Sequence, residues 1–122
     1  MNHPDILLFM SDQHAPQFMA GAEMEVDTPN LDALRREGTS FSEAYTACPL
    51  CVPARMAMLS GIRPSHTGIF TNVDTLPDTQ PTFLHHLAAA GYETVLVGRM
   101  HFIGQDQRHG FTKRIAPDIT LV

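Results

Sequence analysis

Two short apolar runs stand out along the chain, one near its start and one in its second half. Residues 6–10 read Ile-Leu-Leu-Phe-Met, and residues 92–97 end in the apolar sequence Val-Leu-Val. Continuous apolar runs of this length are typical of strands buried on both faces, as in a parallel sheet. We therefore predict a buried strand at each run. A third short strand is expected over residues 39–46, which carry Phe41 and Tyr45 but lack a clean alternation.

Three segments between these strands carry the signals of helices. Residues 28–38 have a Thr, then a Pro at the first helical position, two Arg in the last turn and a terminal Gly. Residues 53–61 and 81–90 also begin near a Pro, and Gly61 and Gly91 stop them. Residues 62–79 are rich in Pro, Asp and Thr and are expected to form a loop. Strands alternating with helices indicate an α/β fold.

The second predicted helix carries the first candidate chemistry. Pro53 at its first position would place Cys51 just before the helix N-terminus, where unpaired N–H groups and the helix dipole favour an anion. Arg55 lies about one turn further on and can reach back to the same point with a permanent charge and a fork of donors. The segment from Cys51 to Arg55 therefore suits a nucleophile that acts on an anionic group.

Polar side chains also follow each of the two apolar runs. Asp12 and Gln13 come directly after residues 6–10, and Arg99 and His101 come directly after residues 92–97. Ligands of open α/β sheets bind at the carboxyl ends of the strands. We expect these side chains to lie close together if the two strands are neighbours.

The run Cys51-Val52-Pro53-Ala54-Arg55, its small apolar helix ending in Gly, and the later basic-x-His motif resemble type I sulfatases of the alkaline phosphatase superfamily. The order of the acidic strand end, the C-x-P-x-R helix start and the basic-x-His strand end matches that family over nearly the whole chain. The resemblance implies the N-terminal portion of an alkaline-phosphatase-like α/β/α sandwich with a mostly parallel sheet. Such sulfatases usually have Lys where this chain has Arg99, and Arg is a planar fork of donors, not a point cation.

The resemblance also implies a set of roles. Cys51 would be the precursor of formylglycine, made by a formylglycine-generating maturation enzyme, and the aldehyde hydrate would attack the sulfur of a sulfate ester and release sulfate. Asp12, Gln13 and an oxygen of the modified Cys51 would bind a divalent metal, Ca²⁺ or Mn²⁺. Arg55, Arg99 and His101 would be catalytic, with His101 placed to assist proton movement.

Within the superfamily, two features are closest to the choline-sulfatase-like branch. They are the tail over residues 100–111 and the single acidic residue in Asp12-Gln13, where arylsulfatases usually have two Asp. That branch places a substrate-contacting Asn at Asn72, although a turn residue in a polar loop is an equally good interpretation. The implied substrate is a small sulfate ester such as choline sulfate.

The chain is much shorter than sulfatases of this kind, which take further metal ligands from a later segment. Residues 1–122 are therefore expected to be one domain that is the N-terminal part of a longer catalytic domain. Alone, it would have half a metal site and an open sheet edge, which favours a homo-oligomer. We expect little turnover from the isolated chain.

Composition narrows the partners and the compartment. With 43% hydrophobic residues and a net charge of −5 over 122 residues, the chain should be globular and should not bind nucleic acid. No apolar run approaches the roughly 20 residues that span a bilayer. The N-terminus does not resemble a secretory signal, so a cytoplasmic protein is expected.

Two other functions stay open at the level of sequence. Cys48 and Cys51 form a C-x-x-C, which in an α/β protein can be a redox dithiol or half of a zinc site, and the chain has 7 His. The second alternative is a phosphonate or phosphate ester hydrolase of the same superfamily. Both kinds of ester are tetrahedral, anionic and rich in oxygen, so one cationic site suits either.

Overall fold

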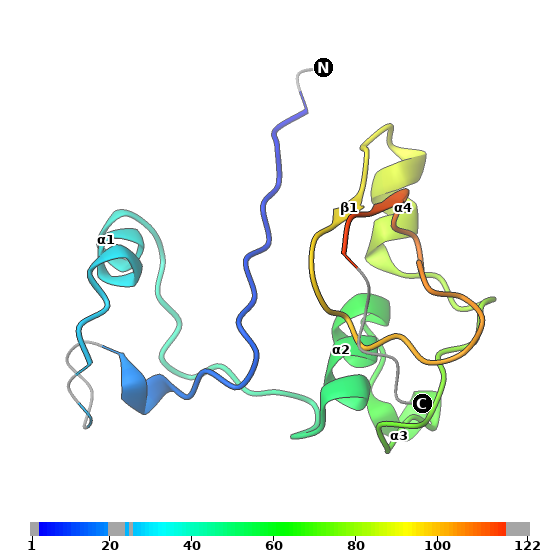
Figure 1. Cartoon of the computed structure of the whole chain (residues 1–122), viewed down its shortest axis with the longest axis horizontal. Coiled ribbons are helices and arrows are strands. Elements are labelled where there is room, and N and C mark those ends of the chain that lie inside the picture. The colour runs from blue at the N-terminus through cyan, green and yellow to red at the C-terminus, as the bar shows by residue number, and fades with distance from the viewer. Residues whose placement is uncertain (1–2, 20–23, 25, 117–122) are drawn as a thin grey trace. The chain divides into compact units, whose positions relative to one another are not determined.

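The computed structural model describes residues 3–19, 24 and 26–116, and the chain divides into two compact units. Unit 1 comprises residues 1–44 and unit 2 residues 45–122. The elements of unit 1 are a 3-10 helix, η1 (Pro16–Phe18), and α1 (Pro29–Glu37). Those of unit 2 are α2 (Cys51–Ser60), α3 (Pro64–Thr67), α4 (Phe83–Ala89), β1 (Val95–Leu96) and β2 (Lys113–Arg114), most of them labelled in Figure 1. The predicted single domain over residues 1–122 stays a prediction.

Unit 1 confirms one expected element and lacks another. Helix α1 begins at Pro29, and the Gly38 N–H donates to the Leu34 carbonyl at 2.9 Å to close its last turn. The strand expected over residues 6–10 is wrong, because this segment has no regular secondary structure and exposes its side chains, Leu7 by 90% and Phe9 by 86%. An apolar run becomes a strand only when a neighbouring strand pairs with its backbone groups.

The strand expected over residues 39–46 is also wrong. The segment is irregular, and its two aromatic side chains are exposed, Phe41 by 80% and Tyr45 by 86%. Aromatic residues favour strands because they pack on a half-buried pleated surface. Without alternation, this segment has no apolar face that such a surface could bury.

Helix α2 starts two residues earlier than its proline predicts. The Ala54 N–H donates to the Leu50 carbonyl at 3.0 Å, so the first helical turn closes around Cys51, and Pro53 is the third helical residue. Proline is compatible with this position because the N–H groups of the first turn have no partner within the helix. The predicted stop at Gly61 is confirmed by its left-handed φ of 70°.

The hydrophobic core of the described residues lies in unit 2 and is organised around α2. Helix α2 packs against both α3 and α4 (Figure 1). The buried apolar face of α2 meets side chains from the following loop, from α4 and β1, and from the segment after β1. The core consists of Val52, Met56, Leu59, Ile69, Leu76, Leu84, Leu96, Met100 and Phe102.

The region between α2 and β1 contains more helix than the sequence indicates. The loop expected over residues 62–79 includes the single turn α3, which begins at a proline and ends at Gly68 with φ 75°. Helix α4 matches the helix expected over residues 81–90. Thr82 is its N-cap in a capping box with His85, whose Nδ1 accepts the Thr82 N–H at 3.0 Å.

The sheet of unit 2 is a short parallel pair. Strand β1 covers only part of the apolar run over residues 92–97, and its register pairs Val95 with Lys113 and Leu96 with Arg114. Strand β2 was not expected, because a Lys-Arg pair carries no apolar signal. The helices and this parallel pair make the described chain an α/β structure, as the sequence predicts.

Within the described residues, every helix is too short or too polar to cross a lipid bilayer.

The turn that leads into β2 is built around a buried histidine. His109 is 1% exposed, and its ring lies 4.8 Å from the Phe102 ring. The main-chain N–H of His109 donates to Asp106 Oδ1 at 3.1 Å. Its Nδ1 lies 3.4 Å from Asp106 Oδ2. Burial lowers the pKa of His109 below its ordinary value of 6.5, against the opposing effect of the Asp106 and Asp78 carboxylates. The imidazole is therefore neutral where the solvent-exposed form would already begin to protonate.

This burial predicts a pH-dependent stability. Because the pKa of His109 is lower in the folded chain than in the unfolded chain, the unfolded state binds the extra proton first as the pH falls below 6.5. The contribution of neutral His109 to the free energy of unfolding is fully present above that pH, and it is lost as the pH falls towards the pKa of His109 in the folded chain. Urea unfolding measured at several pH values should show this loss as a falling free energy of unfolding. In H109N, the free energy of unfolding should depend less steeply on pH, and the Asn side chain tolerates the local φ of 43°. H66Q, at an exposed histidine, is the matched control, and a slope unchanged in H109N would contradict the assignment.

Candidate active site

Cys51 is the first residue of α2 and is half-buried. The first bond within the helix is donated by Ala54, so the N–H groups of Cys51 and Val52 precede it, and Pro53 has none to offer. The helix N-terminus therefore presents few backbone donors near Cys51, and one of them, the Val52 N–H, is bonded to a side chain from a later loop. Their partial positive charge suits an anion or an ionised nucleophile.

Asn72 supplies the cap that Leu50, the N-cap residue, cannot supply. Asn72 Oδ1 accepts the Val52 N–H at 3.0 Å, from a position 20 residues away in sequence. The loop that carries Asn72 is held by Asp74, whose Oδ2 accepts the N–H groups of Phe70 and Thr71 at 2.7 Å each. These bonds lower the pKa of Asp74 below its ordinary value. Asn72 thus positions the start of α2, while its predicted contact with substrate stays a prediction.

Arg55 joins α2 to the segment that follows β1. Its side chain is 8% exposed, and Nη1 donates to the Arg99 carbonyl at 2.7 Å. A buried guanidinium requires such acceptors, because removing a charge from water is costly unless it is hydrogen-bonded. This bond brings together two of the predicted site residues.

Arg99 connects in turn to His101. Arg99 Nη2 lies 2.8 Å from His101 Nδ1, and His101 is 3% exposed. The chain turns sharply here, with φ of 103° at Gly98 and 60° at His101, the second of which is unusual for a residue with a side chain. As expected, these polar groups follow the carboxyl end of a parallel strand.

The two predicted metal ligands from the N-terminal segment belong to unit 1. Asp12 and Gln13 are both exposed, and Gln13 has a φ of 50°. Their grouping with Cys51 stays a prediction, because Cys51 belongs to unit 2. Over residues 3–19, 24 and 26–116, no cluster of three or more His, Cys, Asp or Glu side chains is arranged to hold a metal ion.

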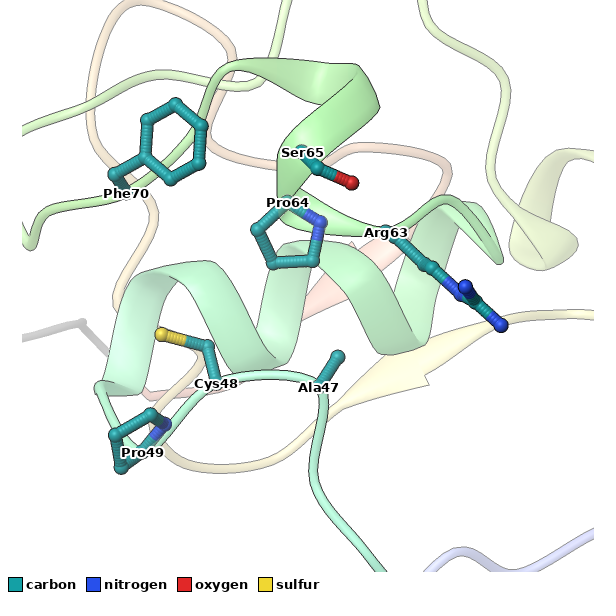
Figure 2. A pocket seen from close by; sticks show the side chains of 7 residues that line it. All are labelled: Ala47, Cys48, Pro49, Arg63, Pro64, Ser65 and Phe70. Atoms are coloured by element: carbon teal, nitrogen blue, oxygen red, sulfur yellow. The ribbon is translucent and has the colours of Figure 1, made fainter.

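Cys48 lies in a different environment from Cys51. It lines an open hollow of about 450 Å³ on unit 2, shown in Figure 2, whose other lining residues are Ala47, Pro49, Arg63, Pro64, Ser65 and Phe70. This hollow contains none of the predicted site residues. Both cysteines are free thiols in the structure, and a functional pairing between them stays an alternative prediction.

Two aspartates have structural roles in turns that the sequence did not indicate. Asp74 and Asp106 look like solvated loop residues in the sequence, yet each carboxylate accepts two backbone N–H groups and fixes a turn. The signal that could have identified them is the position of each Asp in a short loop. There a carboxylate commonly accepts a hydrogen bond from the main-chain N–H of a residue three positions away.

The remote cap predicts a stability effect. N72A should destabilise unit 2 by about 1 kcal/mol, because the Val52 N–H loses its acceptor at the helix start. N72D, which keeps an acceptor oxygen in the same place, should stay near the wild type. Chemical denaturation of the 122-residue chain measures both, and an unfolding midpoint unchanged in N72A would contradict the capping role.

Comparison with known proteins identifies the family. The sulfatase family model matches residues 4–119. The chain is 43% identical to the choline-sulfatase of Rhizobium meliloti over 117 residues, which cover 95% of this chain and 23% of that protein. It is 34% identical to the N-acetylglucosamine-6-O-sulfatase of Bacteroides thetaiotaomicron, over 85% of this chain and 19% of that protein. It is 32% identical to the human N-acetylgalactosamine-6-sulfatase, over 87% of this chain and 24% of that protein.

The fold of this chain is also similar to that of part of a solved structure. That structure holds its substrate, D-glucosamine-2-N,6-O-disulfate, and superposes with a TM-score of 0.78 at 34% identity, over 86% of this chain and 21% of that one. The expected N-terminal portion of an alkaline-phosphatase-like α/β fold is thereby confirmed. The chain spans about a quarter or less of the length of these relatives. With the family model matched over almost every residue, this chain belongs to the sulfatase family.

Proposed function

We propose that this chain supplies the nucleophile side of an active site that hydrolyses a sulfate ester and releases inorganic sulfate. The observation that carries the proposal is the continuous connection from the helix that presents Cys51 through Arg55 and Arg99 to His101. Two guanidinium groups and an imidazole are thereby linked to the helix that begins at Cys51, and cationic donors of this kind suit an anionic ester.

The chemistry of the donor set fits the groups that this activity needs. Asp12 and Gln13 offer oxygen donors, which suit a hard cation such as Ca²⁺ or Mn²⁺, and conversion of Cys51 to formylglycine would replace a soft sulfur with oxygen. After addition of water to its aldehyde, formylglycine would supply a nucleophilic hydroxyl, and the metal would supply positive charge that favours the ionised form of that hydroxyl. We propose these three residues as the part of the metal site that lies within this chain.

The remaining residues would bind and orient the ester. The N-terminus of α2 places partial positive charge beside position 51, and Asn72 fixes that terminus by binding the Val52 N–H. Arg55 and Arg99 provide guanidinium groups, whose planar forks of donors match the oxygens of a tetrahedral anion. His101, buried and held by Arg99, would direct a ring nitrogen at an oxygen of the ester or of the nucleophile.

A small sulfate ester such as choline sulfate is the proposed substrate. The 43% identity with a choline-sulfatase supports this proposal. A phosphonate or phosphate ester is the alternative, because the cationic groups of unit 2 recognise any tetrahedral oxyanion. Since relatives are about four times as long, we propose that substrate choice and full activity need groups outside residues 1–122.

The proposed modification predicts a change in mass. After co-expression with a formylglycine-generating enzyme, the intact mass of the chain should fall by the difference between a CH₂SH group and an aldehyde group. C51A should abolish the change, whereas C48A, which alters the other cysteine of the C-x-x-C, should retain it. A change lost in C48A but kept in C51A would refute the assignment of Cys51.

Activity can be tested in a chimera in which residues 4–119 replace the matching segment of the Rhizobium meliloti choline-sulfatase. With the maturation enzyme present, the chimera should release sulfate from choline sulfate, and C51A should reduce kcat on the order of 10³-fold or more, because it removes the nucleophile. The 122-residue chain alone should release almost none. Faster hydrolysis of an aryl phosphonate than of an aryl sulfate by the chimera would favour the alternative function.

A further inference from the structure

The contact between Arg99 and His101 assigns the donor and the acceptor. Arg99 Nη2 lies 2.8 Å from His101 Nδ1, which is the distance of a strong hydrogen bond. A guanidinium carries five N–H donors, has no acceptor atom and stays protonated in proteins. Arg99 must therefore donate, and Nδ1 of His101 must accept with its lone pair.

An accepting Nδ1 fixes the position of the imidazole proton. A neutral imidazole has one protonated and one unprotonated ring nitrogen, and the hydrogen bond made by one nitrogen determines the state of the other. With Nδ1 unprotonated, the proton of His101 lies on Nε2. We propose that Arg99 is a positioning residue that holds His101 in the Nε2–H tautomer, so that His101 meets the sulfate ester as a hydrogen-bond donor.

The surroundings hold this arrangement in place. The main chain of Arg99 is fixed by Arg55, whose guanidinium donates to the Arg99 carbonyl, and the Arg99 side chain is fixed by the His101 ring. His101 is 3% exposed, so bulk water does not compete for its ring nitrogens. Residue 99 therefore acts in two separable ways, through its carbonyl towards α2 and through its guanidinium towards the imidazole.

The tautomer decides what His101 can contribute. A protonated Nε2 donates to a negatively charged oxygen of the ester or of the released sulfate, and it strengthens the positive field of Arg55 and Arg99. The same nitrogen cannot accept a proton in its resting state. This role in catalysis rests on the proposed function, whereas the tautomer rests only on the contact between the two side chains.

The tautomer is directly measurable by NMR on the full 122-residue chain with ¹⁵N-labelled histidine. Long-range proton–nitrogen spectra distinguish a protonated from an unprotonated ring nitrogen, and loss of one set of signals in H101N assigns His101. We expect an unprotonated Nδ1 and a protonated Nε2 in the wild type. A protonated Nδ1 in the wild type would overturn the proposal.

R99M isolates the role of the guanidinium, because it removes every side-chain donor of residue 99 but leaves the carbonyl that binds Arg55. The His101 signals should then shift towards the Nδ1–H form. R108M is the matched control, since Arg108 is an exposed arginine of the same unit and its replacement should leave the His101 signals unchanged. His101 signals in R99M identical to those of the wild type would show that Arg99 does not set the tautomer.

If R99M fails to fold by circular dichroism, the wild-type spectrum still decides which nitrogen carries the proton. These spectra need neither substrate nor modified Cys51. A wrong tautomer therefore leaves the proposed sulfatase activity standing, and an inactive chimera leaves the tautomer standing.

Discussion

The hydrogen bond from the buried guanidinium of Arg55 to the carbonyl of Arg99 joins the two sequence-distant parts of the candidate site. The residues are 44 positions apart, one on α2 and the other after β1. A buried charge is tolerated only where acceptors replace its water, and a hydrogen bond to a charged group contributes about 1.5–3 kcal/mol. This bond adds to the apolar contacts by which α2 already packs with β1 and the segment that follows it in one core.

The helix start that presents Cys51 relies on groups far from it in sequence. Leu50 offers no side-chain oxygen, and Pro53 removes one backbone donor from the first turn. Asn72 accepts one of the N–H groups that precede the first helical bond, and Asp74 orders the loop that carries Asn72. A cap supplied by the helix itself would place an oxygen beside Cys51. The remote cap instead approaches from the loop after α2, so the start of the helix does not depend on a capping side chain at position 50.

Sequence reasoning succeeded where the signal is local. Helix α1, the end of α2 at Gly61 and helix α4 each follow from caps, prolines and glycines within one turn of their boundaries. It failed where pairing decides the structure. Residues 6–10 have the composition of a buried strand but no regular structure, whereas the Lys-Arg pair of β2 has no apolar signal and yet forms a strand with β1.

For the candidate site as well, local motifs indicate the residues but not the contacts between them. Motif spacing selects Cys51, Arg55, Arg99 and His101 as candidates whose roles stay predictions, and the structure connects the last three through hydrogen bonds. The sequence could not show that Arg99 binds His101 instead of reaching solvent, because the spacing alone does not fix the backbone turn over residues 98–101. That turn depends on the positive φ values of Gly98 and His101, and only the glycine is visible as a signal in the sequence.

The strain of this turn has a physical use. A left-handed φ at a residue with a side chain costs of the order of 1–3 kcal/mol and persists only where its surroundings fix it. At His101 the surroundings are the Arg99 guanidinium, the burial of the ring and the Arg55 contact one step away. Donors held in this way need no reorganisation when negative charge develops on an ester, which is the condition under which fixed dipoles and cations are most effective. The strained turn, the two arginines and the imidazole form one hydrogen-bonded unit, and under the proposed function this unit would be preorganised to bind an anion.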